Sequence, residues 1–376
     1  MDNQLRNGVE KILNVELDDV QWKQATLPIR DGGLGIRQVS MLASSAYLAS
    51  AASTKPLGSI ILGMEDWNDE YKNQILSARG STLPVGNAQA LTKQSAWDRP
   101  LIEQDKAEVW NAYTDPCSRA RLVAVSSPHS GDWLLTMPIS SCGLCLDNEA
   151  FRVAIGLRLG LKLCAPHQCR CGEGVDPGGH HGLVCKLSSG RASRHYAIND
   201  IIWRALQKAD IPSSKEPLGL LRSDGKRPDG STLVPWSAGK YITWDVTNVH
   251  TCAPSYIHRT SVMAGGAAEL AAVRKRAKYP DLHVPSSHTF VPIAIESLGP
   301  INQSGFDFIS EVGRRISAIS GDPRERNQLF QRLSICTQQF NAVAFRGAFE
   351  EFSVDEAWYS PRTAFILRII TKSLGE

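Results

Sequence analysis

Two aspartates interrupt the stretch GKRPDGSTLVPWSAGKYITWDVT, residues 225–247, which otherwise has the composition of two β-strands. Asp229 follows a proline, and Asp245 lies within a run rich in Tyr, Ile, Trp and Val. Burial of a carboxylate costs free energy unless the group is paired, hydrogen-bonded or bound to a metal. Two carboxylates on neighbouring strands can hold Mg²⁺ through hard oxygen ligands. The pattern therefore predicts a magnesium site suited to phosphodiester hydrolysis.

A lysine beside such a site would stabilise the negative charge that develops in the transition state. Because strand side chains alternate between faces, Asp245 points away from the apolar face of its own strand. Thr247 occupies the next position on the same side. We therefore expect the amine to come from Lys275 or Lys278, which share one face of a following helix rich in alanine. Glu216 is a candidate third carboxylate, with a surface ion pair as the alternative.

Basic residues flank the two aspartates on both sides, and such clusters are typical of surfaces that bind nucleic-acid phosphates. The alternative for each cluster is a solvated helix face. The net charge of +3 does not by itself indicate a nucleic-acid partner. The candidate phosphate contacts are Arg194, His195, Lys226, Arg227, Arg274 and Arg276.

A second candidate site lies in CAPHQCRCGEGVDPGGHHGLVC, residues 164–185, which is too poor in apolar residues to form a core. We expect a metal to organise this segment. Clustered cysteines in a chain with no secretory signal favour metal ligation over disulfides. The alternative is a set of ordinary buried thiols. The predicted ligands of a structural zinc are Cys169, Cys171, Cys185 and His180, with His181 as the alternative to His180.

Apolar periodicity and strand composition predict a mixed α/β fold of the α+β class. The segment from 193 to 298 contains, in order, a helix, three strands, a helix from 255 to 279 and a further strand. Amphipathic helices follow. Four regions are predicted: 1–146, helical; 147–190, a helix capped by Asp147 or Asn148 plus a zinc knuckle; 191–300, an α-β-β-β-α-β core; and 301–376, C-terminal helices.

Length and composition are those of a folded protein, with 376 residues, 42% of them hydrophobic and 21% charged. No stretch approaches the roughly 20 apolar residues that span a bilayer. We therefore expect a soluble, intracellular protein with no membrane partner. The basic run RKRAK, residues 274–278, favours a nuclear location.

Several short motifs together resemble the carboxy-terminal part of LINE-type retrotransposon polyproteins: CRCG…GHHGLVC, RHYAIND, KRPDG, WDVT and KRAKY. In those polyproteins a zinc knuckle precedes a restriction-like endonuclease of the PD-(D/E)xK superfamily. The upstream LPIRDGGLGIRQ…LASSAYLAS is similar to the segment that follows the reverse transcriptase in related elements. The resemblance covers residues 20–300 and is most specific from Cys169 to Tyr279.

The resemblance implies a restriction-endonuclease-like core that nicks target DNA in the presence of Mg²⁺ and exposes a 3′ hydroxyl to prime reverse transcription. The implied partners are DNA, element RNA and a reverse transcriptase supplied by a full-length element. The implied catalytic acids are Asp229 and Asp245, and the family's downstream lysine corresponds to Lys275 or Lys278. The implied zinc ligands are Cys169, Cys171, His180 and Cys185.

The sequence also departs from the family pattern. Thr247 stands where the superfamily usually has lysine, and RHY lacks the asparagine that often follows the histidine, although Asn199 lies one turn on. There is no Tyr-x-Asp-Asp polymerase signature, so we expect no polymerase activity and consider a truncated copy of an element. The alternative function is a catalytically inactive, zinc-stabilised nucleic-acid-binding relic of a retroelement.

Overall fold

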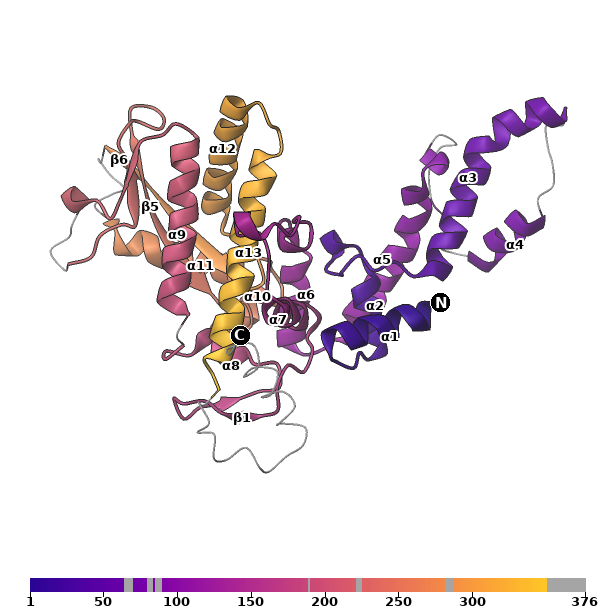
Figure 1. Cartoon of the computed structure of the whole chain (residues 1–376), viewed down its shortest axis with the longest axis horizontal. Helices are drawn as coiled ribbons and strands as arrows, with labels where there is room; N and C mark the ends of the chain where they lie inside the picture. Colours follow the sequence, from indigo (N-terminus) through magenta and orange to yellow (C-terminus); the bar gives the residue numbers. More distant parts are fainter. Residues whose placement is uncertain are drawn as a thin grey trace.

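A four-stranded mixed sheet packed between helices lies at one end of the structure, a computed structural model (Figure 1). The described residues are 1–63, 70–79, 84, 90–188, 190–220, 225–280 and 287–349. The last part of the predicted C-terminal region, 350–376, lies outside them. The fold is mixed α+β, as predicted from the sequence.

The sheet has the strand order β3-β4-β5-β6. Strands β3, β4 and β5 pair antiparallel, and β5 and β6 pair parallel. Two helices occupy the connection between the parallel strands. The predicted order of helix, three strands, helix and strand is confirmed by α9 (Arg191–Lys208), β3 (Ser213–Lys215), β4 (Gly230–Thr232), β5 (Tyr241–Val249), α10 (Ile257–Thr260), α11 (Gly266–Lys278) and β6 (His288–Glu296).

Strand β5 divides the packing into two layers because its side chains alternate between faces. Trp244, on the apolar face, is fully buried together with residues of α9, α12 (Gln303–Ser320) and α13 (Glu325–Arg346). Gly230 on β4 is required here, since a Cβ atom at this position would lie 2.0 Å from the Trp244 ring. The opposite face of the sheet is covered by α11.

Helix α11 approaches the sheet through small side chains, as predicted. Ala268, Ala271 and Ala272 are buried against Ala294 of β6. The predicted single helix from 255 to 279 is wrong, however, because the chain forms α10 and α11 with a break between them. Gly265, at the N-cap of α11, has a φ of 75°, a left-handed conformation that does not continue a helix.

The first two strands of the sheet are short, with three residues each. Strand β3 ends at Lys215 because the next residue, Glu216, has a φ of 47° and leaves the extended conformation. Strand β4 pairs only over Gly230–Thr232. All four strands are therefore paired only near Asp229, and farther along β5 the sheet consists of the β5–β6 pair alone.

The cysteine-rich segment 164–185 follows α7 (Asn148–Leu159), whose N-cap is Asp147. The Asp147 carboxylate accepts a hydrogen bond from the Ala150 amide at 2.7 Å. This bond confirms the predicted helix start. The segment itself contains a two-stranded antiparallel hairpin and one short helix, β1 (His167–Gln168), β2 (Gly174–Val175) and α8 (His180–Val184).

The N-terminal part of the chain is helical, as predicted. Helices α3, α4 and α5 lie on the side of the molecule away from the sheet, whereas α6 and α7 lie beside α13 (Figure 1). No helix in the described ranges is long and apolar enough to cross a membrane. The helices and 3₁₀ turns not yet named are α1 (Asp2–Leu13), α2 (Asp19–Thr26), η1 (Ile29–Asp31), α3 (Val39–Leu62), α4 (Glu70–Arg79), η3 (Ala90–Thr92), α5 (Gln94–Ala112), α6 (Pro116–Val125), η4 (Asp132–Leu134), η5 (Ser140–Cys142) and η6 (Leu218–Leu220).

Candidate functional site

Asp245 lies on β5 on the face covered by α11, as strand alternation predicted, and its side chain is only 2% exposed. Lys275 Nζ contacts Asp245 Oδ1, and Lys278 Nζ lies 3.5 Å from Asp245 Oδ2. Both lysines come from the last turn of α11. The structure therefore brings together the buried acid and the two candidate amines, and the ion pairs compensate for its burial.

Asp229 directly precedes β4, and the antiparallel register places it beside Asp245. Gly230 pairs with Trp244, and the Asp229 amide donates a hydrogen bond to the Trp244 carbonyl at 3.0 Å. The Asp229 carboxylate oxygen Oδ2 accepts a hydrogen bond from the Val246 amide at 2.6 Å. The two predicted acids therefore occupy opposite positions on neighbouring strands.

His195, in the second turn of α9, contacts the first of these acids. Its Nε2 atom lies 3.0 Å from Asp229 Oδ1, and this hydrogen bond raises the pKa of His195 above its usual value. An imidazolium at this position is stabilised by the carboxylate. His195 thus orients Asp229, a contact that the sequence analysis missed when it placed this histidine only toward phosphate.

Asn199, one turn further along α9, joins the two acid-bearing strands to the helix. Its Nδ2 atom donates to the Asp229 carbonyl at 3.3 Å, and its Oδ1 atom accepts from Trp244 Nε1 at 2.8 Å. The residue is 4% exposed. In the sequence, this role is indicated by a polar residue among the apolar residues that form the buried face of the helix. A buried amide side chain requires hydrogen-bond partners.

A cleft of about 250 Å³ opens beside these residues, between α9 and the end of β5. Its lining includes two arginines, a lysine and a histidine but no acidic side chain among the described residues, a composition suited to a phosphate. A larger hollow of about 450 Å³ lies along α12 and contains none of the predicted site residues. The lining residues of the cleft are Arg191, Ala192, Arg194, His195, Val246, Thr247, Asn248 and Lys275.

Arg194 lines this cleft, but its side chain is buried and does not extend into solvent as a phosphate contact would. Its side chain is 5% exposed, and its Nη1 atom donates to Asn341 Oδ1 of α13 at 3.3 Å. Burial lowers the pKa of Arg194 to about 10. Arg191, three residues earlier on α9, is exposed at the rim of the cleft. The structure thus adds Arg191 to the candidate phosphate contacts.

Glu216 is not brought together with the two acids. Its carboxylate forms an ion pair with Arg227, although its amide donates to the Asp229 carbonyl at 3.0 Å. The prediction of a third catalytic carboxylate is therefore corrected to the ion pair. The left-handed backbone of Glu216 turns its side chain out of the strand alternation on which the prediction depended.

The other predicted basic contacts lie outside the cleft lining. Arg274 Nη1 donates to the Tyr256 hydroxyl at 2.6 Å, and Arg276 Nη2 donates to Ser304 Oγ at 2.8 Å. Lys226 is exposed in the segment before Asp229. Of the predicted set, only Arg194, His195 and Lys275 border the cleft.

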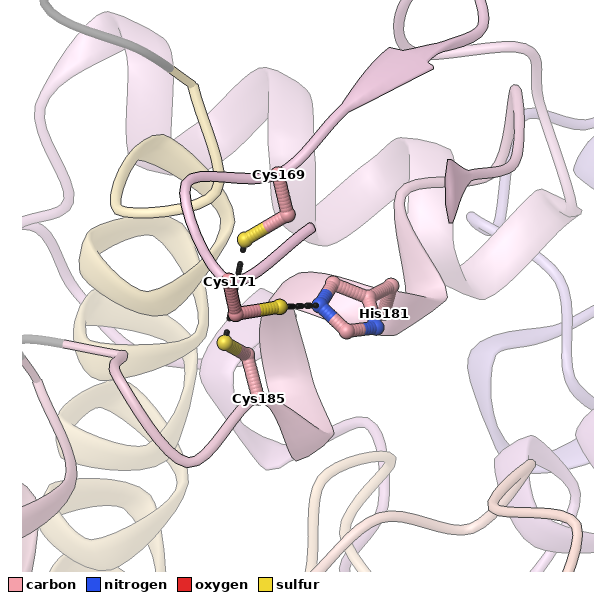
Figure 2. A group of neighbouring side chains, drawn as sticks. All are labelled: Cys169, Cys171, His181 and Cys185. Carbon is pink, nitrogen blue, oxygen red and sulfur yellow. Dashed lines mark hydrogen bonds between the residues drawn. The ribbon is translucent and has the colours of Figure 1, made fainter. Parts of the chain in front are cut away.

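A separate group of four side chains can hold a metal ion such as zinc: Cys169, Cys171, His181 and Cys185 point toward one another (Figure 2). Their ligand atoms all lie within 4.8 Å of one another. Cys171 Sγ lies 3.1 Å from His181 Nε2, and Cys169 Sγ lies 3.7 Å from Cys185 Sγ. Three thiolates and an imidazole are a complete donor set for a tetrahedral structural zinc.

The local fold explains why these four side chains converge. A tight turn carries both Cys169 and Cys171, and it is closed by a hydrogen bond of 2.7 Å from the Gly172 amide to the Cys169 carbonyl. His181 and Cys185 lie four residues apart along α8 and its C-cap, and therefore on one side of it. Burial raises the pKa of the Cys169 thiol to about 11, so metal binding must release a proton there.

The choice of His180 as the histidine ligand is wrong, and the alternative His181 is the one in this group. Successive residues of an α-helix are separated by about 100° around its axis, so only one of the two can face the cysteines. His180 Nε2 instead lies 3.8 Å from Cys117 Sγ, and His180 Nδ1 lies 3.2 Å from His250 Nε2.

Comparison with known proteins gives no family for this chain. No model of a known protein family matches the sequence, and no similar curated protein was found. The functional interpretation therefore depends on the chemistry of the two sites described above.

Proposed function

We propose that this chain is a metal-dependent DNA endonuclease of retroelement origin, with a restriction-like core of the PD-(D/E)xK kind and a structural zinc knuckle. In this proposal it nicks target DNA by phosphodiester hydrolysis, and the exposed 3′ hydroxyl primes reverse transcription by a partner polymerase. The observation that carries the proposal is the contact between Lys275 and the buried Asp245, beside Asp229 and a basic cleft.

The donor chemistry of the two aspartates suits Mg²⁺, which proteins commonly hold through one or two carboxylates while water and substrate phosphate complete the shell. Asp229 and Asp245 would hold the ion. When bound, it would supply charge neutralisation at the phosphate and a more acidic water. The contact of Asp245 with two lysines supports this assignment, because it shows that cationic groups reach this buried carboxylate.

The contacts of the charged residues that line the cleft suggest roles for Lys275, Arg191 and His195. Lys275 reaches both Asp245 and the cleft, so its ammonium group is placed to stabilise charge on a phosphate. Arg191, which is exposed at the rim of the cleft, would bind the DNA backbone from the α9 side. His195 would keep the Asp229 carboxylate in one orientation. Zn²⁺ in the knuckle would be structural, and a DNA substrate agrees with a nuclear location.

The second candidate function is a nucleic-acid-binding relic without catalysis, and one observation favours it. Both carboxylates already have partners from the chain itself: two lysines for Asp245, and a backbone amide and His195 for Asp229. Thr247 also borders the cleft where the superfamily usually has lysine. In that case the basic residues would bind DNA and nothing would be cleaved.

One experiment distinguishes these two functions. A labelled duplex is incubated with the purified chain in Mg²⁺ or Mn²⁺ and in EDTA, and both nicking and retention of the duplex by the protein are measured. The endonuclease predicts nicking with metal and binding alone in EDTA. Salt-sensitive binding in every buffer, without nicking in any, would support the relic. Absence of both would contradict the two functions together.

A further inference from the structure

We infer that the chain has a second metal site, formed by Cys117, His180 and Cys252, which binds a borderline-soft divalent cation such as Zn²⁺. The ligand atoms of these three residues lie within 4.8 Å of one another. None of them belongs to the knuckle group or to the proposed active site. Two thiolates would balance the charge of the dication, so this partly buried site would be neutral overall.

The distances agree with shared coordination of one ion. A tetrahedral zinc with Zn–S of about 2.3 Å and Zn–N of about 2.0 Å separates sulfur from nitrogen by about 3.5 Å. Cys117 Sγ lies 3.8 Å from His180 Nε2. Cys252 is 7% exposed, and its sulfur faces the Cys117 backbone carbonyl at 3.7 Å. Small shifts of the side chains would bring all three atoms to bonding distance of one ion.

The second ring nitrogen of His180, Nδ1, has a hydrogen-bond partner. Metal-binding histidines usually form such a bond through the nitrogen that does not bind the metal. His180 Nδ1 lies 3.2 Å from His250 Nε2, and His250 Nδ1 lies 2.7 Å from Ser297 Oγ. Ligation through Nε2 would require a proton on His180 Nδ1, donated to His250. This chain of two imidazoles and a hydroxyl, buried at His250 and Ser297, therefore fixes the orientation that a ligand needs.

The three ligands come from three elements that are distant in the sequence. Cys117 lies in the first turn of α6, His180 begins α8, and Cys252 follows β5, the strand that carries Asp245. A metal here would join the N-terminal helices, the knuckle and the end of the central strand. Three protein ligands leave a fourth position of a tetrahedron for water.

Metal stoichiometry of the purified full chain tests this site. Zinc per chain is measured by elemental analysis after dialysis against zinc-free buffer. We expect two zinc ions in the wild type, one in Cys117→Ser and in Cys252→Ser, one in Cys171→Ser, and none in the Cys171→Ser/Cys252→Ser double variant. Cys336→Ser is the matched control, because Cys336 is a buried cysteine outside both groups, and it should retain two.

The knuckle site reports whether a variant has folded. Cys117→Ser and His180→Ala should each lose one zinc while the knuckle retains its own, and the far-ultraviolet circular dichroism should be unchanged. One zinc in the wild type, unaffected by Cys117→Ser and Cys252→Ser, would overturn the proposal. A wild-type mass 2 Da lower than the sequence mass, with Cys117 linked to Cys252 in a non-reducing peptide map, would overturn it in favour of a disulfide.

Discussion

Lys275 Nζ, on α11, contacts Asp245 Oδ1, on β5, so a lysine from the helix reaches a carboxylate that is almost completely buried. The next position on the acid's own strand that faces the same side is Thr247, so the strand itself supplies no amine there. In this chain the amine beside the acid comes from helix α11 and not from the strand. The contact also makes the account testable residue by residue.

Replacement of the buried acid should separate cleavage from binding. In Asp245→Asn we expect nicking to fall by about 10²-fold or more, since a charged ligand of the metal is lost. DNA binding should be unchanged or tighter, because one negative charge near the phosphates is removed. Gel-shift and nicking assays on the same preparation measure both quantities.

The matched control for that variant is Asp200→Asn. Asp200 lies on the exposed side of α9 and pairs with Arg204 and Lys215, away from the cleft. It should nick and bind like the wild type. Equal loss of nicking and binding in Asp245→Asn would indicate damage to the fold and argue against a metal site at this carboxylate.

The two lysines of α11 should not be equivalent. Lys275 borders the cleft, whereas Lys278 lies 3.5 Å from the other oxygen of Asp245 and is absent from the cleft lining. We expect Lys275→Gln to lower the nicking rate by about 10² to 10³-fold and Lys278→Gln by much less. A larger loss in Lys278→Gln would reverse the assignment of the amine.

A lysine returned to the strand should compensate for the loss of the helix lysine. Thr247 and Lys275 border the same cleft. The double variant Thr247→Lys/Lys275→Gln should therefore nick faster than Lys275→Gln alone, with Thr247→Gln/Lys275→Gln as the uncharged control. If both double variants remain as slow as Lys275→Gln, the position of the ammonium group in the cleft is not what limits cleavage.

The contact between His195 and Asp229 should be visible in a pH titration of the chain in buffer without Mg²⁺. The hydrogen bond raises the pKa of His195 above its usual 6.5. We expect the imidazole proton signals in nuclear magnetic resonance to titrate above that value, and Asp229→Asn to shift the midpoint down. An unshifted midpoint in both proteins would show that the pair does not form in solution.

The same shift has a consequence for stability. Because the folded-state pKa of His195 is raised above its unfolded value, the protonated imidazole stabilises the fold. This contribution is fully present below about pH 6.5 and is lost as pH rises through the higher folded-state pKa. The melting temperature difference between wild type and Asp229→Asn should therefore shrink between neutral and alkaline pH.

Removal of a knuckle ligand should unfold a defined segment. Cys171→Ser is expected to lose one zinc ion and to exchange amide hydrogens faster between residues 165 and 190, because this segment has little apolar core of its own. His181→Ala should behave alike. Cys142→Ser is the control, since Cys142 is exposed and outside the metal-ligating groups among the described residues. Unchanged zinc content in Cys171→Ser would refute the assignment.

Much of the sheet could be predicted from the sequence because the signals were local. The run KYITWDVT has strand composition, and its alternation placed Asp245 opposite the apolar face on which Trp244 packs. The alanines before Lys275 indicated a helix that approaches the sheet closely. These features depend on residues two to four positions apart, so spacing alone was informative.

Other features depend on contacts that spacing does not encode. His180 and His181 are adjacent, and only the start of α8 decides which of them faces the cysteines. The burial of Arg194 depends on Asn341 of α13, far along the chain. Cys117 and Cys252 were not recognised as partners because the fold alone brings α6 beside the turn after β5.

The measurement that tests the central claim most directly is nicking of supercoiled plasmid by the purified chain in Mg²⁺, alongside EDTA, Asp229→Ala, Asp245→Ala and Asp200→Ala. The account predicts open-circle product that needs metal, disappears in Asp229→Ala and Asp245→Ala and persists in Asp200→Ala. Metal-dependent nicking that survives in Asp229→Ala and Asp245→Ala, or no nicking by a wild-type chain that binds the plasmid, would contradict it.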